Sequence, residues 1–400
     1  MEWADPKGDD RAALARDLRA ILILALAPAI GLGIGRFAFA LLLPDMRASL
    51  GWSYAQAGLM NTLNALGYLL GALGAASTAR RLGEFRSVWT GSLLCVAGLA
   101  LSALSGNFAI LGAARLLAGF GAALAFVAGG ALTAGMAQRH PAQAAFLRSL
   151  FYAGPGIGIA LSGLITPVLL HRLGPGTWWL AWAVLAALSG VFAMVLLLAR
   201  HATGRSPAPA EVPAKVTARA MAPMLASYFA FGAGYIAYMT FMIAYVRDSG
   251  GGPLLQAAFW TLIGCGAVAS PWLWSGIIHR HHGGRAVAIL TGLTGLGAVL
   301  PLASPSAPAL FASALLFGSA FFAVVASTTA FVQRNFSHEA WPAGIALMTI
   351  SFGLGQTLGP VATGAITDWS GGLSAGLWLS AALLAAAMAL AAGQRDLARG

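Results

Sequence analysis

Charged side chains are scarce in this 400-residue chain. Only 9% of the residues are Asp, Glu, Lys or Arg, whereas 59% are apolar, and the mean hydropathy is +0.79. Ordinary soluble domains carry about 25% charged residues, so this composition excludes that class. Long apolar stretches with few charges are typical of helices that cross a lipid bilayer. The chain is therefore predicted to be an all-α integral membrane protein.

Cysteine and lysine are nearly absent. The two cysteines, Cys95 and Cys265, lie in different apolar stretches and leave no basis for a disulfide framework or a cysteine metal cluster. The two lysines, Lys7 and Lys215, lie outside any glycine-rich phosphate-binding loop of the kind that ATP-driven pumps need. We therefore expect no cofactor and no bound metal. If the protein pumps a substrate, a gradient must drive it.

Acidic residues are missing from the middle of the apolar stretches. The twelve Asp and Glu residues fall in tails, in loops or at the ends of stretches, as Asp45, Asp248 and Asp368 do. No stretch carries paired carboxylates, a nucleophile beside a base, or a metal-ligand spacing. An enzyme is therefore not expected, and a membrane sensor is disfavoured because the chain carries no soluble domain.

Twelve apolar stretches are long enough to cross a bilayer, since about 20 helical residues span the hydrocarbon. We expect spans near residues 20–43, 53–79, 87–105, 108–136, 145–170, 176–199, 222–246, 253–278, 285–303, 307–332, 341–367 and 374–392. A polar, proline-rich segment in the middle is typical of a flexible linker. The predicted layout is a tail at 1–19, a six-helix bundle at 20–200, a linker at 201–220, a second bundle at 221–392 and a tail at 393–400.

The basic residues predict how the chain crosses the membrane. With a cytoplasmic N-terminus, 18 of the 23 Lys and Arg residues fall on the cytoplasmic side, and only Arg47, Arg172 and Arg247 fall on the other. Cytoplasmic loops of membrane proteins carry such an excess, so both termini are predicted to be cytoplasmic. The formal charge of +11 is then explained by loops that face anionic lipid, and nucleic acid is not an expected partner.

A repeat relates the two halves of the chain. Six residues recur at a constant distance of 201 positions: Phe151, Gly154, Gly158, Gly163, Ile165 and Thr166 return as Phe352, Gly355, Gly359, Gly364, Ile366 and Thr367. Both copies lie in apolar stretches, so the duplicated unit is half of a membrane protein. Two related halves usually enclose a site between them, which favours a carrier of a small molecule.

Several motifs resemble those of the major facilitator superfamily over nearly the whole chain. In span 1, the string Gly33-Ile34-Gly35-Arg36-Phe37 is similar to the uncharacterised bacterial YbfB/YjiJ-like branch. Further matches are Arg115 and Gly119 in span 4, the Gly-Pro motif of Gly154, Pro155 and Gly158 in span 5, and Gly359 with Pro360 in span 11. The loop after span 2 keeps Arg80, Arg81 and Gly83, but Arg80 stands where the family usually has Asp, so this loop lacks the carboxylate of the family's usual cytoplasmic latch.

The resemblance implies two six-helix bundles related by a pseudo-two-fold axis along the membrane normal, in a monomer of a bacterial inner membrane. Spans 1, 4, 7 and 10 would line a central cavity, and spans 2, 5, 8 and 11 would form the sliding contact between the halves. Small residues at intervals of four let helices approach closely. We expect three such stripes at this contact, with packing inside one half as the alternative: Gly67 and Gly71; Gly154, Gly158 and Ser162; Gly355, Gly359 and Thr363.

Arg36 and Arg115 are the two basic residues that fall inside spans, and they are candidate substrate-binding residues. A buried arginine costs about 2.5 to 3.5 kcal/mol on insertion scales and needs a partner, water or a ligand. Paired guanidinium hydrogen bonds suit a carboxylate or a phosphate. The structural alternative is that either arginine ties carbonyls of a kinked helix, because Pro28 and the glycines of 31–35 would loosen span 1.

Polar side chains on other spans are further candidates for the substrate site. Tyr235 and Tyr238 belong to a tyrosine face of span 7, and Asn64 and Gln356 lie in spans 2 and 11. A hydroxyl or amide at membrane depth needs a hydrogen-bond partner, which a polar cavity would supply. Neighbouring helices could satisfy these groups equally well, and for the amides that is the commoner arrangement.

The leading function from the sequence is a secondary transporter that moves a small organic anion by rocking one half against the other, coupled to protons or a counter-anion. The alternative is a proton-coupled exporter of neutral or cationic amphiphiles. That alternative lacks a counter-charge in the spans, so Asp45 or Asp368 would have to serve.

Overall fold

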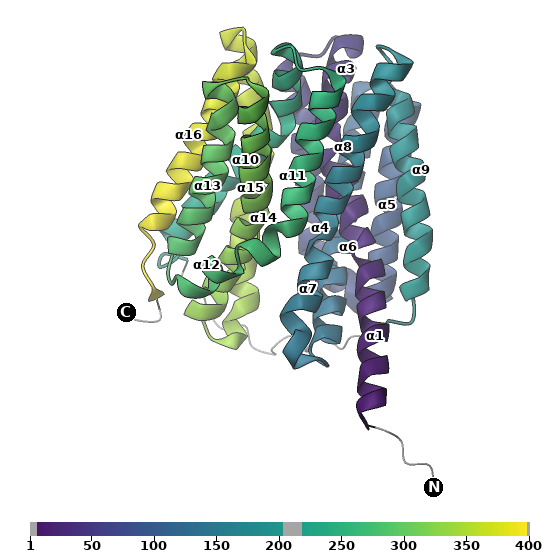
Figure 1. Ribbon diagram of the computed structural model, residues 1–400, viewed down its shortest axis with the longest axis vertical. Helices are drawn as coiled ribbons and strands as arrows, with labels where there is room; N and C mark the ends of the chain where they lie inside the picture. Colours follow the sequence, from purple (N-terminus) through teal and green to yellow (C-terminus); the bar gives the residue numbers. More distant parts are fainter. Residues whose placement is uncertain (1–5, 203–217, 398–400) are drawn as a thin grey trace.

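The computed structural model describes residues 6–202 and 218–397, in which all regular structure is helical (Figure 1). Twelve helices are long and apolar enough to cross a membrane. They are Arg11–Leu50 (α1 Pro6–Leu24, α2 Leu26–Pro28, η1 Ala29–Phe37, α3 Phe39–Leu50), α4 (Tyr54–Leu82), α5 (Glu84–Leu104), α6 (Phe108–Ala137), Pro141–Leu173 (η2 Pro141–Gln143, α7 Ala144–Tyr152, α8 Gly154–Leu173), Trp178–Ala199 (α9 Trp178–Leu196, η3 Leu197–Ala199), α10 (Ala222–Asp248), α11 (Pro253–Leu273), α13 (Arg285–Ala303), α14 (Ala307–Asn335), His338–Ser370 (η4 His338–Ala340, α15 Trp341–Ser370) and α16 (Leu373–Ala392).

The predicted number and order of spans are confirmed, and the first span is longer than predicted. It runs over 40 residues, from Arg11 to Leu50, because polar turns extend the helix at both ends of the apolar stretch. A short helix, α12 (Ser275–Arg280), follows α11. The helix α1 begins and α16 ends at the same end of the molecule (Figure 1), which we call the near end; the other is the far end.

Local signals set the helix ends. Ser53 and Gln56 form a capping box at the start of α4. The backbone N–H of Gln56 donates to the Ser53 hydroxyl, and the backbone N–H of Ser53 donates to the side-chain oxygen of Gln56. Asn107 caps α6 with its side-chain oxygen alone, which accepts from the backbone N–H of Ala109 at 2.9 Å. Gly83 separates α4 from α5 with a φ of 86°, a conformation that favours glycine.

The helices form two six-helix bundles that meet along two pairs of spans. In these pairs α4 packs along α15, and α8 packs along α11. Glycines allow this approach: a Cβ on Gly264 would lie 2.7 Å from the carbonyl oxygen of Gly156, and one on Gly58 would strike the carbonyl of Pro360. Spans 2, 5, 8 and 11 therefore make the contact between the bundles, as the resemblance implied.

The predicted stripes of small residues pack inside the bundles, so their expected place at the contact between the halves is wrong. Gly154 and Gly158 of α8 face the carbonyls of Ala25 and Ala29 in the first span. In the same bundle, Gly67 and Gly71 face the backbone of α6. Small residues permit any close crossing of helices, so their spacing alone did not reveal which neighbour they face.

The second bundle repeats this crossing. Gly355 of α15 faces the carbonyl of Phe229, and Gly359 faces that of Ala233, both in α10. These two carbonyls lie 204 residues after those of Ala25 and Ala29 in the chain. The sequence repeat thus preserves the crossing of span 1 with span 5 and of span 7 with span 11.

Span 1 contains a wide π-helical segment, η1, in which all nine residues are buried. The glycines on its two sides meet different neighbours. A Cβ on Gly31 would lie 2.9 Å from the Cα of Ala122 in α6, and one on Gly33 would lie 2.5 Å from the Cα of Gly158 in α8. Wide turns of this kind are frequent at functional sites, and this one carries Arg36.

Candidate functional site

Arg36 lies between the two bundles and has 2% of its surface exposed. Its Nε and Nη2 atoms are buried and have no hydrogen-bond partner among the described residues. The guanidinium carbon lies 5.5 Å from the ring centre of Tyr68 and 5.9 Å from that of Phe37. Phe37 packs edge-on against Phe321 and Phe322 of the second bundle, at 6.1 and 6.3 Å. A buried positive charge with unused donors therefore stands at the junction of the bundles.

Arg115 holds the backbone of η1. Its Nη1 donates to the carbonyl of Gly35 at 2.6 Å, and its Nη2 donates to the carbonyl of Arg36 at 3.2 Å. The side chain is 2% exposed and its guanidinium carbon lies 4.8 Å from the ring centre of Phe39. Arg115 therefore ties carbonyls of span 1, which is the structural alternative expected from the sequence. The glycines of span 1 leave these carbonyls accessible to its guanidinium.

The asparagines of α4 supply acceptors on the side of the first bundle. Asn64 donates from Nδ2 to the carbonyl of Arg115 at 3.0 Å, an approach that Gly119 permits by packing against the backbone of Asn64. Asn61 donates from Nδ2 to the hydroxyl of Thr240 in α10 at 2.5 Å. The Oδ1 atoms of both asparagines are buried and have no hydrogen-bond partner among the described residues.

Tyr235 and Gln356 form the corresponding polar pair of the second bundle. The Nε2 of Gln356 donates to the Tyr235 hydroxyl, and the Oε1 of Gln356 is buried without a hydrogen-bond partner in the described part of the chain. Phe321 connects this pair to Arg36, because its ring lies 5.9 Å from that of Tyr235 and 6.1 Å from that of Phe37, the neighbour of Arg36. Tyr235, with Gln356 bound to it, therefore belongs to the same junction as Arg36.

A stack of aromatic rings forms the wall behind Tyr235. Its ring lies parallel to those of Phe231, Phe352 and Phe321, with centroids 5.1, 5.6 and 5.9 Å away. Apart from Tyr235, these rings were not singled out from the sequence. Phe352 did carry a signal, since it is the repeat partner of Phe151. Flat apolar surface and a buried cation thus occur side by side.

Tyr238 points away from Arg36 and into its own bundle. Its hydroxyl shares a hydrogen bond of 2.5 Å with the Ser313 hydroxyl, and its ring stacks on Phe317 at 4.1 Å. Tyr245 likewise donates to the carbonyl of Pro301 at 3.2 Å. Neighbouring helices of the same bundle thus satisfy the hydroxyls of these two tyrosines, which is the alternative that the sequence left open for the tyrosine face of span 7.

The remaining motif residues lie at helix ends and crossings. Arg80 and Arg81 are exposed in the last turn of α4, at the near end. The carbonyls of Pro155 and Pro360 lie at two crossings, against Gly33 and Gly58 respectively. These positions shape how the helices meet and contribute no side chain to the junction around Arg36.

A carboxylate joins the bundles at the far end. Both oxygens of Asp368, near the end of α15, accept hydrogen bonds of 2.8 Å from the N–H groups of Tyr54 and Ala55 at the start of α4. The Tyr54 hydroxyl donates to Asp248 at 3.3 Å, and Arg47 lies over the Tyr54 ring at 3.8 Å. An anion at the N-terminus of a helix is favourable, so these contacts hold the far end together.

Twelve membrane-spanning helices in two related bundles, with buried polar groups where they meet, define a transporter of the major facilitator type. Residues 28–392 match the family model described as "Uncharacterised MFS-type transporter YbfB", and the chain belongs to this family. It is therefore a multi-pass membrane transporter and not an enzyme.

Similar proteins agree with this assignment. A 2-nitroimidazole transporter of Escherichia coli (strain K12) is 33% identical over 135 residues, a stretch that spans 33% of each chain. A mutant of the nucleoside transporter NupG has the same fold, with a TM-score of 0.71 at 14% identity over 93% of this chain and 98% of that one. A bacterial homolog of the human lysosomal transporter Spinster gives 0.69 at 15% identity over 94% and 96%.

Proposed function

We propose that this transporter carries a small organic anion that binds to Arg36 between the two bundles. The observation that supports the proposal is the pair of buried guanidinium atoms, Nε and Nη2, that lack hydrogen-bond partners among the described residues. Removing donors from water without pairing them is costly, about 1 to 3 kcal/mol or more for a charged group. A ligand with two acceptor oxygens offsets that cost and gains the paired geometry that guanidinium favours.

The surroundings of Arg36 also favour a flat ligand. Tyr68 lies beside the guanidinium and the ring of Tyr235 belongs to a parallel stack, so the site presents flat aromatic faces on which a ligand ring would stack. The free oxygens of Asn64 and Gln356 can accept hydrogen bonds from a ligand N–H or O–H. We therefore propose a planar substrate with acceptor oxygens at one edge and a donor elsewhere.

The alternative function, export of cationic amphiphiles, is disfavoured by the position of the carboxylates. Asp45 accepts hydrogen bonds from the N–H groups of Gly176 and Trp178, at 2.8 and 3.0 Å. Asp368 is engaged at the start of α4. Both acids that could balance a substrate cation thus have backbone partners far from Arg36, whose own charge repels a cation.

A neutral nitro-heteroaromatic substrate is a second candidate within the same site. The relative from Escherichia coli is a 2-nitroimidazole transporter, and a nitro group presents two acceptor oxygens as a carboxylate does. Export of such a neutral molecule would use the same contacts with Arg36. The two candidates differ in whether the bound form carries a negative charge.

We propose that transport proceeds by rocking of the bundles about this site. The contacts of Asp368 with α4 would close the far end and break when it opens, and the buried pair of Asn61 and Thr240 would part with them. A counter-anion, or protons carried with the substrate, would supply the driving force. The proposed working unit is a monomer with bundles at 20–200 and 221–392.

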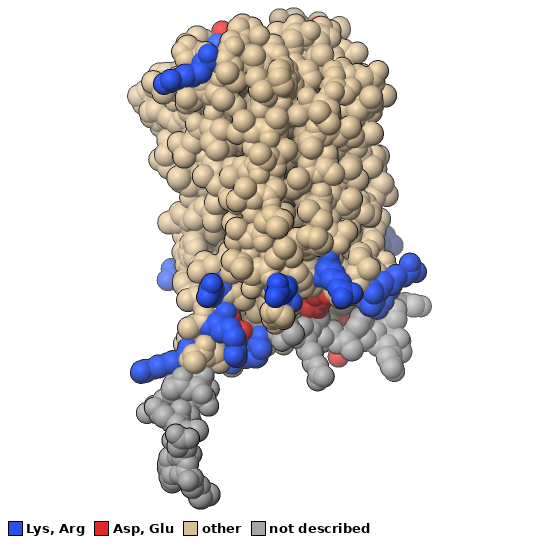
Figure 2. Space-filling model, turned by 90° about the vertical axis from the view of Figure 1, so that its right-hand side faces the viewer, with Lys and Arg blue, Asp and Glu red and all other residues tan. Residues whose placement is uncertain are grey.

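We further propose that the near end faces the cytoplasm of a bacterial cell, with both termini inside. Figure 2 shows Lys and Arg gathered in a band at the near end and few of them at the far end of the visible face. This asymmetry supports the orientation because cytoplasmic segments carry the excess of basic residues. Reporter fusions at the two ends of the chain, active only on one side of the membrane, would test it.

The proposed substrate class is tested by thermal stabilisation of the purified full chain against matched panels of aromatic carboxylates, neutral nitro-heteroaromatics and aromatic cations. A ligand that binds only the folded protein raises its stability with occupancy. We expect the carboxylates to stabilise the parent and to lose that effect in Arg36→Gln. The control variant Arg172→Gln removes an exposed positive charge at the far end and should respond like the parent.

Stabilisation by the nitro compounds alone, also lost in Arg36→Gln, would support the second candidate. If cations stabilise the parent, or Arg36→Gln responds like the parent, the assignment of Arg36 as the ligand-binding residue is wrong.

A further inference from the structure

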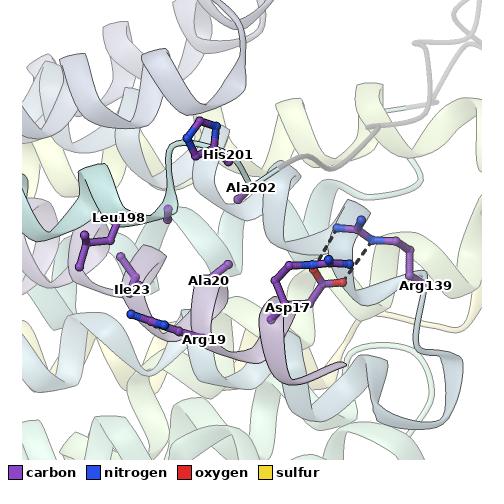
Figure 3. Close-up of a pocket in the computed structure, with 10 residues that line it drawn as sticks. Asp17, Arg19, Ala20, Ile23, Arg139, Leu198, His201 and Ala202 are labelled. Carbon is purple, nitrogen blue, oxygen red and sulfur yellow. Dashed lines mark hydrogen bonds and ion pairs between the residues drawn. The ribbon is translucent and has the colours of Figure 1, made fainter. Parts of the chain in front are cut away.

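A cavity at the near end of the first bundle is lined by basic and apolar side chains (Figure 3). It has a volume of about 510 Å³ and is formed by α1, the end of α6 and the segment after α9. We propose that it binds the phosphate-bearing headgroup of an anionic phospholipid. Neither the transport site nor the contact between the bundles involves this cavity.

One wall of the cavity is held in place by a buried carboxylate. Asp17 of α1 is 4% exposed, and its Oδ2 lies 3.3 Å from Arg139 Nε and 3.0 Å from His140 Nε2. Arg139 Nη2 also donates to Asp17 Oδ1 at 3.3 Å. These contacts tie α1 to the end of α6, so the wall is built into the fold.

The cavity keeps an excess of positive charge. Arg16, Arg19 and Arg139 line it, and Asp17 is the one acidic residue among the described residues that line it. Arg16 and Arg19 are exposed and three residues apart, which places them side by side on α1. Since Asp17 is already bound to Arg139 and His140, an anion entering the cavity meets two further guanidiniums.

His201 lines the cavity on the opposite side. Its Nε2 accepts a hydrogen bond of 3.0 Å from Nε of Arg200, which sets the orientation of the ring. Figure 3 shows His201 and Arg19 on different sides of the space between α1 and the segment after α9. A phosphate group has acceptor oxygens for donors on both sides.

Apolar side chains complete the cavity and distinguish a lipid from a soluble phosphate. Ala20, Ile23, Leu198 and Ala199 line it on the side toward the membrane-spanning region. Leu198 is 66% exposed, and the neighbouring Leu22 of α1 is 50% exposed. Basic residues at the membrane surface next to exposed apolar side chains suit a charged headgroup with its acyl chains beside the helices.

The proposal is tested by titrating the purified full chain with phosphatidylglycerol, with phosphatidylcholine and with inorganic phosphate, reading thermal stabilisation and bound lipid by native mass spectrometry. We expect phosphatidylglycerol to bind the parent at least about tenfold more tightly than phosphatidylcholine. The double variant Arg16→Gln/Arg19→Gln should lose about tenfold in that preference. Arg16→Lys/Arg19→Lys keeps the charges and should retain most of it.

The matched control is Arg80→Gln/Arg81→Gln, which removes two exposed charges at the same end but outside the cavity. An equal loss of preference in this control would mean that general attraction of basic residues to anionic lipid explains the binding, and the assigned site would be wrong. Equal binding of the two lipids to the parent would also overturn the proposal. Stabilisation by inorganic phosphate that matches phosphatidylglycerol would identify a soluble phosphate and not a lipid.

Discussion

The guanidinium of Arg115 donates from Nη1 to the carbonyl of Gly35, 2.6 Å away, and so binds the residue that precedes Arg36. Its second hydrogen bond, from Nη2 to the carbonyl of Arg36, binds the next peptide group of the π-helical segment η1. These two bonds hold the backbone on which the Arg36 side chain is mounted. We therefore propose that Arg115 is a positioning residue for Arg36.

Replacing Arg115 by Gln should lower the stability of the protein by about 1 to 3 kcal/mol, because two buried carbonyls lose their partner. Ligand affinity should fall as well, since Arg36 would no longer be held in one orientation. Thermal unfolding and ligand-induced stabilisation measure the two effects together. A variant with parental thermal stability but no ligand response would instead place Arg115 in direct contact with the ligand.

Tyr235 and Tyr238 form a matched pair for testing the site. Tyr235→Phe removes the hydroxyl that Gln356 binds near Arg36, so ligand affinity should change by several-fold while the ring stack remains. Tyr238→Phe removes the bond to Ser313 and should cost about 1 kcal/mol of stability without altering affinity. Equilibrium binding and unfolding measured on both variants separate the effects. The opposite pattern would move the site toward Ser313.

Neutralising Asp368 should favour conformations with an open far end. Asn can accept only through one oxygen, so Asp368→Asn loses one of the two bonds to the start of α4 as well as the favourable charge. An anionic cap is worth about 1 kcal/mol, or roughly a fivefold change in a conformational equilibrium. Spin labels at Ala48 and Ser374, with both native cysteines replaced, should report a larger fraction of long distances.

Asp248→Asn is the control for that measurement. Asp248 accepts one bond from the Tyr54 hydroxyl, and an amide oxygen can replace it. The distribution of spin-label distances in Asp248→Asn should match that of the parent. An unchanged distribution in Asp368→Asn would mean that the backbone contacts of Asp368 do not hold the far end closed.

Gly33 should tolerate no side chain. A methyl group there would stand 2.5 Å from the Cα of Gly158 and 2.6 Å from the carbonyl oxygen of Pro155, so Gly33→Ala should cost about 1 to 3 kcal/mol. Gly74→Ala is the matched control, because a Cβ at Gly74 meets nothing within 4 Å. Thermal unfolding of both variants in detergent measures the difference. A stable Gly33→Ala would show that span 1 can move away from α8.

The sequence predicted the positions of the spans well, but it predicted poorly which helices pack against one another. Hydropathy placed the ninth span at residues 285–303, where α13 lies, because burial in lipid is a property of composition. Hydropathy predicted a first span that is too short, because the helix continues through polar turns on either side of the apolar stretch. The glycine stripes were assigned to the wrong neighbour because small residues suit contacts inside and between the bundles equally well.

Within the candidate site, the sequence identified the charges and not their contacts. Arg36 and Arg115 stand out alone in apolar stretches. Only the structure shows that Arg115 donates two hydrogen bonds to carbonyls and keeps one buried donor, Nε, without a partner among the described residues, whereas Arg36 keeps two such donors. Tyr68 was missed, although it follows Asn64 by four residues and so shares its helix face. The π-helical turn was not predicted, because the glycine-rich string indicated a loosened helix without specifying its form.

Ala29 crosses Gly158 in the first bundle, and Ala233 crosses Gly359 in the second; Ala233 follows Ala29 by 204 residues and Gly359 follows Gly158 by 201. The shift of 204 residues gives counterparts in the second bundle for residues of span 1. By this shift, Arg36 corresponds to Thr240, whose hydroxyl accepts a hydrogen bond from Asn61. The duplicated scaffold thus has a one-sided distribution of charge. An anion held by Arg36 would remain attached to the first bundle while the second moves over it, which makes the two halves unequal partners in transport.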